Sequence, residues 1–235
     1  MSHNKPRLLD TFCCAGGTTR GYQLAGFEVV GVDIAPQKHY IGEHFIQANA
    51  LDVLYAFAHG DCWDDTDGHL WHLEDFAAIH ASPPCQAFSK TRSMRRKYAE
   101  EHYIDLLTPT RAALASFPVQ IPWVIENVPG APGPWDIRLC GTMFGLRGRS
   151  PVHRHRYFQA SFQLPLPPFA CSHTERAMNV YSSGPARNGT EREFCDAIGV
   201  TWGNVDEGME AIPPAYTEFI GKQLMAFLRQ EKAVG

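Results

Sequence analysis

The feature that most constrains the fold is an apolar run that breaks at a glycine turn and is followed, at a fixed distance, by a second apolar run. Residues 7–12 form the first run, and Cys13-Cys-Ala-Gly-Gly17 interrupts it. Residues 18–25 then have the composition of a short helix, and the β-branched run 27–34 reaches Asp33, 21 positions after the first run ends. This order is typical of a βαβ unit and predicts a nucleotide-type site at the turn.

The same alternation continues along the chain. Strand-like runs at 43–48, 76–81 and 123–128 each end in a polar or proline-bearing loop, and a helical pattern covers 98–117, with a new helix or a kink expected at Pro109. A chain of 235 residues is long enough for one substantial domain. We therefore expect an α/β fold with a doubly wound, mostly parallel sheet, whose ligands bind beyond the carboxyl ends of the strands.

The pattern loosens between residues 140 and 208, where Pro, Gly, Ser and Arg are frequent, and we expect a small irregular insertion there. The last segment begins with Ala211-Ile-Pro-Pro214 and continues to residue 229 with apolar residues at helical spacing. Such an amphipathic helix is expected to pack back on the sheet.

Composition excludes several classes of protein. No apolar run approaches the roughly 18–20 residues of a membrane span, and the polar amino terminus has no apolar segment behind it, so we expect a cytoplasmic protein that does not contact membranes. A formal net charge of −4 means that a nucleic acid would have to be held by local basic patches. Seven cysteines without a framework spacing indicate reduced thiols rather than disulfides.

Cys85 is the strongest candidate for a reactive group. It lies in Ser82-Pro-Pro-Cys-Gln-Ala-Phe-Ser89, directly after the run 76–81, so the end of a strand would expose its sulfur to a cleft. One cysteine among seven is more often an inert buried thiol, but the flanking prolines favour the reactive role. A thiolate that adds to carbon 6 of cytosine makes carbon 5 enamine-like, which methylation at carbon 5 requires.

Glu126 and two arginines could complete such a site. Glu126 lies at the end of an apolar strand, where desolvation would raise its pKa toward a protonated form that can donate to ring nitrogen 3 of cytosine. Arg154 and Arg156 lie two apart in a strand-like pattern, so both can face one cleft and contact a phosphate or the pyrimidine oxygen. The plainer reading places all three side chains on a solvated surface.

Taken together and in this order, these motifs resemble the cytosine-5 DNA methyltransferase family over nearly the whole chain. The resemblance implies the Rossmann-like fold of methyltransferases that use S-adenosylmethionine and release S-adenosylhomocysteine. It also implies double-stranded DNA as the substrate, a flipped-out target base and a role of the restriction-modification kind. The catalytic residues that the resemblance implies are Cys85 as nucleophile, Glu126 as the acid that recognises the base, and Arg154 and Arg156.

The resemblance also assigns binding residues. For the cofactor these are Phe12, Cys14, Ala15, Gly16, Gly17, Asp33, Ile34, Asp52, Val53, Pro83 and Ile212. For the nucleic acid they are Gln86, Ser89, Lys90, Arg92, Arg95, Arg96 and Asn127. The basic run after Cys85 would form a loop that closes over the flipped base.

The family pattern divides the chain into three parts. Residues 1–158 form the catalytic and cofactor-binding domain, 159–207 a reduced target-recognition region, and 208–235 a terminal segment that packs back on the first part. The short middle part predicts a short or relaxed site preference. Three positions depart from the family pattern, with Cys14, Val152 and Met209 in place of the usual glycine, glutamine and asparagine. We expect a monomer without an obligate protein partner.

Several alternatives remain open from the sequence. The same residues would serve methylation of RNA, or transfer of a modified group from a modified cofactor. A catalytically silent nucleic-acid-binding relative is disfavoured by the intact pair Cys85 and Glu126, and a dehydrogenase by the missing Gly-x-Gly-x-x-Gly pattern. Cys171-Ser-His173 with Cys195 suggests zinc, but the paired close spacings of zinc sites are missing, and no metal is expected.

Overall fold

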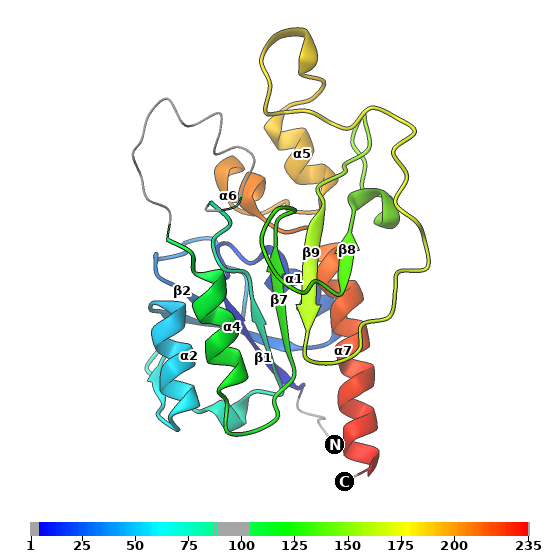
Figure 1. The fold of residues 1–235 in the computed structure, drawn as a ribbon. Helices are drawn as coiled ribbons and strands as arrows, with labels where there is room; N and C mark the ends of the chain where they lie inside the picture. Colours follow the sequence, from blue (N-terminus) through cyan, green and yellow to red (C-terminus); the bar gives the residue numbers. More distant parts are fainter. Residues whose placement is uncertain (1–4, 87, 89–103, 235) are drawn as a thin grey trace.

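A computed structural model describes residues 5–86, 88 and 104–234. Its centre is a seven-stranded sheet in the order β3-β2-β1-β6-β7-β9-β8, with β9 antiparallel to both of its neighbours and the strands from β3 to β7 in this order parallel (Figure 1). The strands of this sheet are β1 (Arg7–Thr11), β2 (Glu28–Asp33), β3 (His44–Gln47), β6 (Ala78–Ala81), β7 (Trp123–Asn127), β8 (Ile137–Leu139) and β9 (Arg156–Ala160). A separate hairpin joins β4 (Trp63–Asp64) and β5 (Leu70–Trp71).

Helices cover both faces of the sheet. The apolar core on one face includes α2 (Ala50–Ala58) and α4 (Leu107–Ala115), and the core on the other includes α1 (Gly17–Ala25) and α7 (Pro214–Val234). Successive strand residues alternate between these cores, as Leu9 packs under α2 and Leu8 under α7. The apolar runs of β1, β2, β6 and β7 are continuous because both faces of these strands are buried. The prediction of a doubly wound, mostly parallel sheet is confirmed.

Close packing of α7 against α1 brings the two ends of the chain together. A side chain on Gly21 would collide with Thr217 and with the backbone of Pro214, so glycine is required where the helices cross. The buried hydroxyl of Thr217 donates to the carbonyl of Thr18 at 2.9 Å. In consequence the segment before α7 lies against the glycine turn, where a Cβ on Gly17 would also meet the backbone of Ile212.

Of the helical pattern at 98–117, residues 98–103 lie outside the described part. The described remainder contains α4, which starts at Leu107, so Pro109 falls in its first turn, where a missing N–H costs no helical hydrogen bond. The carboxylate of Asp105 accepts hydrogen bonds from the free N–H groups of Leu107 and Thr108, at 2.9 and 3.2 Å. Pro109 therefore marks the start of a helix, one of the two outcomes expected.

The segment between residues 140 and 208 is not wholly irregular, as Figure 1 shows. It contains α5 (Glu191–Ala197) and α6 (Val205–Glu210), and both begin with a capping box, Thr190 with Glu193 and Asn204 with Glu207. The described residues include three short 3₁₀ helices: η1 (Leu73–Asp75), η2 (Gly141–Phe144) and η3 (Gly184–Ala186). The segment also has its own small apolar core, which consists of Val152, Met178, Val180, Phe194, Ile198, Val200 and Ala211.

Among the helices of the described residues, none has both the length and the apolar character needed to cross a membrane.

Candidate active site

A cavity of about 1080 Å³ opens beyond the carboxyl ends of β1, β2, β6 and β7. Its walls come from the loops after these strands, from the segment just before β9, and from residues between 177 and 212. Pockets for one drug-sized ligand measure about 300–1000 Å³, so this cavity is at the large end of that range. It lies where ligands of doubly wound sheets bind.

Cys85 and Glu126 face this cavity from neighbouring strands. Cys85 lies in the loop after β6 and is half-buried, and Glu126 is near the end of β7 and only 5% exposed. The two strands are parallel and in register, with Ala81 opposite Ile125, so their loops leave the sheet at the same edge. Both side chains line this one cavity, and burial together with the charge of Glu126 raises the pKa of Cys85.

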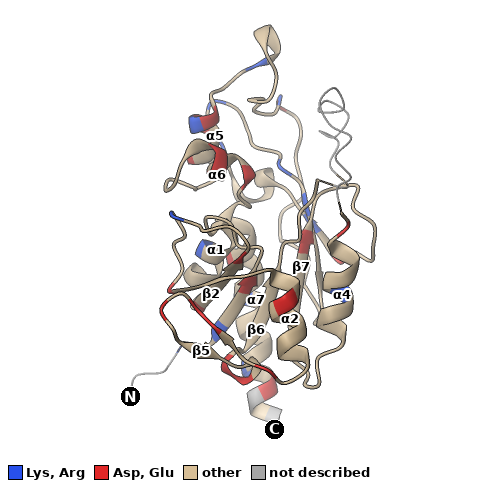
Figure 2. Cartoon of the chain, turned by 90° about the vertical axis from the view of Figure 1, so that its left-hand side faces the viewer, with Lys and Arg blue, Asp and Glu red and all other residues tan. Residues whose placement is uncertain are grey.

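Arg156 joins the pair from the antiparallel neighbour of β7. Its Nε lies 2.9 Å from Oε1 of Glu126, and both side chains are largely buried. Burial raises the pKa of Glu126 to about 7, although Arg156, Arg154 and a hydrogen bond from Ser82 act in the opposite direction. Near neutral pH the carboxyl is thus divided between an acid that can donate a proton and a carboxylate. Figure 2 shows the acidic position at the end of β7 beside basic ones.

The thiol of Cys85 is protonated in most molecules at neutral pH. Desolvation raises its pKa above the ordinary value of 9.0, Arg156 lowers it, and Glu126 raises it again. A thiolate therefore needs either a higher pH or a proton acceptor in the substrate complex.

Arg154 and Arg156 line the same cavity but have different partners. Arg154 precedes β9, and it donates to the hydroxyl of Tyr181 at 3.1 Å and to the carbonyl of Met209 at 2.8 Å. Its guanidinium also lies over the ring of Phe194, 5.3 Å from the centroid. Arg154 thus connects the cavity to the segment 159–207, whereas Arg156 contacts Glu126.

Asn127, which the resemblance places at the nucleic acid, is fully buried and is not among the cavity-lining residues. Its Nδ2 donates to the carbonyl of Pro83 at 2.9 Å, and its Oδ1 accepts from the N–H of Val128 at 2.9 Å. Both polar ends of the side chain therefore bind backbone. This residue holds the Cys85 loop against the end of β7.

Asn127→Ala is expected to lower the free energy of unfolding by about 2–3 kcal/mol, because the buried carbonyl of Pro83 and the N–H of Val128 lose their partner. Urea denaturation at pH 7 measures this loss. Asn49→Ala is the reference, since the exposed Asn49 makes one capping bond, to Leu51, worth about 1 kcal/mol. An equal or smaller loss in Asn127→Ala would contradict this role.

The glycine turn has an unusual backbone. Phe12 and Cys14 have positive φ values of 62° and 46°, a region that favours glycine, so a glycine would be unstrained where Cys14 stands. The N–H of Cys14 donates to Asp33 Oδ2 at 3.0 Å, and that of Ala35 donates to Oδ1 at 3.0 Å. Burial raises the pKa of Cys14 to about 12, so its thiol stays neutral.

Most of the residues predicted at the cofactor line the cavity. They are Phe12, Cys14, Ala15, Gly17, Asp33, Ile34, Pro83 and Ile212. The other three do not line it: Gly16 and Val53 are buried beside it or in the core, and Asp52 is exposed on the first turn of α2. Asn49 and Ala50 line the cavity at the start of α2 instead. The sequence does carry a signal for Asn49, a capping residue that follows a strand.

Of the residues predicted to contact the nucleic acid, some are described by the structure and others are not. Gln86 is exposed and lines the cavity. Ser89, Lys90, Arg92, Arg95 and Arg96 lie outside the described residues. Several lining residues were missed because they come from the loosely patterned segment or directly follow it, where nothing in the spacing marks them: His153, Met178, Tyr181, Phe194, Asp206 and Glu210.

A series of hydrogen bonds between buried polar side chains leads to Ser82, at the start of the loop that carries Cys85. The hydroxyl of Tyr22 lies 2.9 Å from Nδ1 of His80, and Nε2 of His80 lies 2.8 Å from the hydroxyl of Ser82. Burial lowers the pKa of His80 to about 3, so the ring is neutral and can accept on one side and donate on the other. Ser82 in turn bonds Glu126. Sequence spacing gives no sign of this chain.

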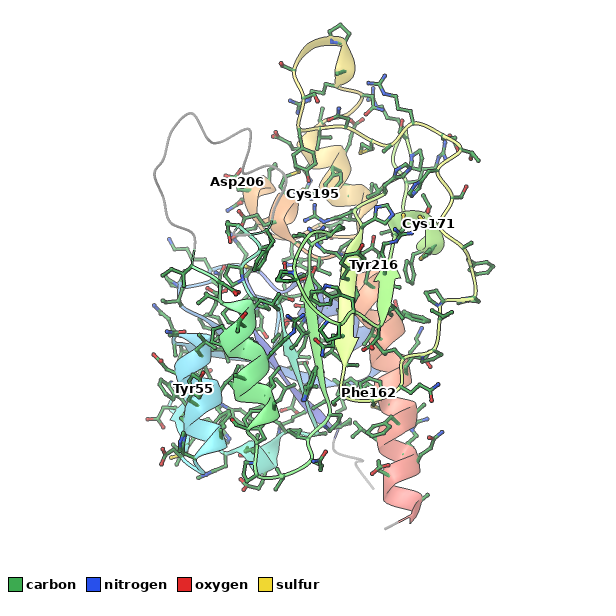
Figure 3. All side chains as sticks on the ribbon, in the orientation of Figure 1. Tyr55, Phe162, Cys171, Cys195, Asp206 and Tyr216 are labelled. Atoms are coloured by element: carbon green, nitrogen blue, oxygen red, sulfur yellow. The ribbon has the colours of Figure 1, made fainter. Side chains whose placement is uncertain are left out.

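Four possible metal ligands lie outside the cavity lining. They are Cys140, His155, Cys171 and His173, and their ligand atoms all lie within 4.8 Å of one another. Cys195, which the sequence grouped with Cys171 and His173, is not one of them. It lies on α5, whereas Cys171 lies near η2 (Figure 3).

Comparison with known proteins adds a family and a fold. Residues 7–133 match the family model of C-5 cytosine-specific DNA methylases. The Dnmt2 methyltransferase of S. pombe is 14% identical, with 96% of this chain and 98% of that chain covered and a TM-score of 0.51. A predicted DNA modification methyltransferase encoded within a prophage of E. coli is 20% identical, with 65% and 45% covered and a TM-score of 0.39. No sequence among the curated proteins matches significantly.

The chain thus spans less than half the length of the prophage protein. The Dnmt2 structure matches the whole arrangement of sheet and helices, which is the Rossmann-like fold of methyltransferases. The family match covers more than half of the 235 residues and includes the glycine turn, the Cys85 loop and Glu126. The chain belongs to the C-5 cytosine-specific DNA methylase family.

Proposed function

We propose that this protein transfers a methyl group from S-adenosylmethionine to carbon 5 of cytosine in double-stranded DNA, through a covalent bond between Cys85 and carbon 6 of a flipped-out base. One observation carries the proposal. Cys85 and Glu126 line a single cavity with Asp33 and the glycine turn, so a nucleophile, an acid and a nucleotide-type pocket share one space. The match to a DNA methylase family favours DNA over RNA.

The cavity suits S-adenosylmethionine. The carboxylate of Asp33 ends β2, where it can accept hydrogen bonds from ribose hydroxyls, and the adjacent Ile34 is 72% exposed, an apolar surface that a flat adenine would cover. We assign the remaining contacts to Phe12, Cys14, Ala15, Gly17, Pro83 and Ile212. When bound, the cofactor supplies an electrophilic methyl group on a sulfonium.

The residues on the other side of the cavity account for activation of the base. The Cys85 thiolate adds to carbon 6 of cytosine, and Glu126 in its acid form donates a proton to ring nitrogen 3 as negative charge develops there. Carbon 5 is then nucleophilic enough to accept the methyl group. Loss of the carbon 5 proton to water, expulsion of the thiolate and return of the ring nitrogen 3 proton to Glu126 then restore the aromatic ring and the acid.

The arginines have separate parts in this mechanism. Arg156 holds Glu126 at 2.9 Å and lowers the pKa of Cys85, so it favours the thiolate at the moment of attack. Arg154 ties the cavity to residues 159–207, which we propose as the reduced target-recognition region, with Tyr181 at its edge. We assign Gln86, which is exposed and lines the cavity, to the nucleic acid. Asn127 acts through the Cys85 loop rather than on a base.

The test is methyl transfer from tritiated S-adenosylmethionine to duplex DNA and to tRNA, measured side by side. Label is expected in the DNA, and digestion of the DNA is expected to yield 5-methylcytosine. Label confined to tRNA would refute the DNA substrate, and label in a product other than 5-methylcytosine would refute the reaction. Sequencing the methylated positions then shows how short the recognised site is.

A further inference from the structure

We propose that Cys140, His155, Cys171 and His173 bind one zinc ion, which fastens residues 159–207 to the start of β9. The four ligands come from three stretches of chain: Cys140 follows β8, His155 immediately precedes β9, and Cys171 and His173 share a loop beyond it. Because ligands from separate stretches converge, the arrangement is a product of the fold and not of local spacing.

The distances fit a tetrahedral ion. Nε2 of His155 lies 3.3 Å from Sγ of Cys171, and Nε2 of His173 lies 3.4 Å from Sγ of Cys140 and 2.8 Å from Sγ of Cys171. With Zn–S near 2.3 Å and Zn–N near 2.0 Å, a tetrahedron separates its ligand atoms by about 3.3–3.8 Å. Small adjustments of the loop would therefore bring all four atoms to ligand distance.

The chemistry of the set points to zinc. Two thiolates and two imidazoles form a borderline-soft donor set, which suits Zn²⁺ rather than Mg²⁺ or Ca²⁺. Four protein ligands fill a tetrahedron and leave no open position for a substrate, as in structural zinc sites. None of the four lines the cavity, which agrees with a role outside the chemical step.

The surroundings already orient the ligands. Thr142 Oγ1 lies 3.2 Å from Sγ of Cys140 and accepts from the N–H of Ser172 at 3.1 Å, so η2 holds both cysteine-bearing segments. The ring of His153 stacks on that of His173, with centroids 4.0 Å apart and an interplanar angle of 18°. Such supporting contacts fix ring orientation around metal sites.

The position of His155 gives the ion a consequence for the active site. His155 stands between Arg154 and Arg156, which contact the segment 159–207 and Glu126 respectively. An ion bound here would fix the backbone that carries both arginines. The small apolar core of this region draws Met178, Val180, Phe194, Ile198 and Val200 from residues 159–207, and a bound metal would add to the stability that this core provides.

Metal content tests the proposal without any measurement of methyl transfer. The zinc proposal can therefore fail while the proposed function stands, and the proposed function can fail while the zinc proposal stands. The full chain is expressed with zinc and purified under reducing conditions without chelators, and zinc is then measured by mass spectrometry. We expect about one zinc per chain, and at most about a tenth of that in Cys171→Ser and in His173→Ala. Cys62→Ser is the matched control, because Cys62 is exposed and is not one of the four proposed ligands. This variant should keep the zinc content of the wild type.

A second measurement needs no variant and so does not depend on the folding of one. Metal-free protein titrated with Co²⁺ is expected to develop the intense visible bands of a tetrahedral site together with thiolate-to-cobalt charge transfer, saturating near one equivalent. Wild-type protein without zinc and without these bands would overturn the proposal. So would undiminished zinc in Cys171→Ser, or a disulfide between Cys140 and Cys171 in the zinc-supplied protein.

Discussion

Cys85→Ser should lower methyl transfer to duplex DNA by about 10³-fold or more while leaving the affinity for S-adenosylmethionine within about twofold of wild type. The serine hydroxyl matches the thiol in shape but ionises far less readily, so it cannot add to carbon 6 of cytosine. Cys85→Ala should behave in the same way, because it lacks a nucleophile altogether. Single-turnover transfer of tritiated methyl groups and calorimetric titration with the cofactor measure the two effects.

Cys62→Ser is the control for this pair of variants, since Cys62 is an exposed thiol outside the cavity, and its transfer rate should be unchanged. The covalent bond can also be observed directly. DNA that carries 5-fluorocytosine cannot lose a proton from carbon 5, so wild-type protein should form an adduct that survives denaturation, and Cys85→Ser should not. Undiminished transfer by Cys85→Ser would refute the covalent mechanism.

Glu126→Gln should lower transfer by about 10²–10⁴-fold, the range that a positioned general acid contributes. The amide keeps the size of the side chain but cannot pass a proton to ring nitrogen 3. The rate of transfer at saturating cofactor, measured across pH 6 to 10, is the informative quantity. Glu74→Gln serves as control, because Glu74 is exposed on η1 and makes no contact with the cavity.

The pH profile distinguishes a proton donor from a purely structural carboxyl. The active form has a thiolate at Cys85, whose pKa is raised above 9.0, and a protonated Glu126, whose pKa is about 7. Wild-type activity should therefore rise to pH 7, stay level up to the thiol pKa, and fall above it, since the singly protonated protein predominates between the two values. Glu126→Gln should instead keep rising about tenfold per pH unit between 7 and 9, and a level region in that variant would exclude the acid role.

The mostly parallel sheet and the position of its ligand cavity could be predicted because they depend on local pattern. Continuous apolar runs specify strands that are buried on both faces, and the glycine turn specifies the first crossover. Cys85 and Glu126 could be identified because each follows or ends such a run, and parallel strands leave the sheet at one edge. The sequence also contains the capping boxes at Thr190 and Asn204. Helices α5 and α6, which begin there, were nevertheless not predicted, because the surrounding composition is typical of loops.

Other features have no local signature. Asn127 looks like a polar residue at the mouth of a cleft, but its partner is the carbonyl of Pro83, 44 positions away, and only the pairing of β6 with β7 brings them together. Gly21 is required by the close crossing of α1 and α7, a contact between the two ends of the chain. The chain from Tyr22 through His80 to Ser82 likewise joins distant segments.

By itself the sequence determined the class of fold, the family and the two residues most suited to the chemistry, because periodicity, turn residues and short motifs act over a few positions. Tertiary structure alone decided the ion pair of Glu126 with Arg156, the contacts of Arg154 with Tyr181 and Met209, and the meeting of Cys140, His155, Cys171 and His173. Burial and charge at a site are set by segments that are far apart along the chain, and no local pattern records which of them will become neighbours.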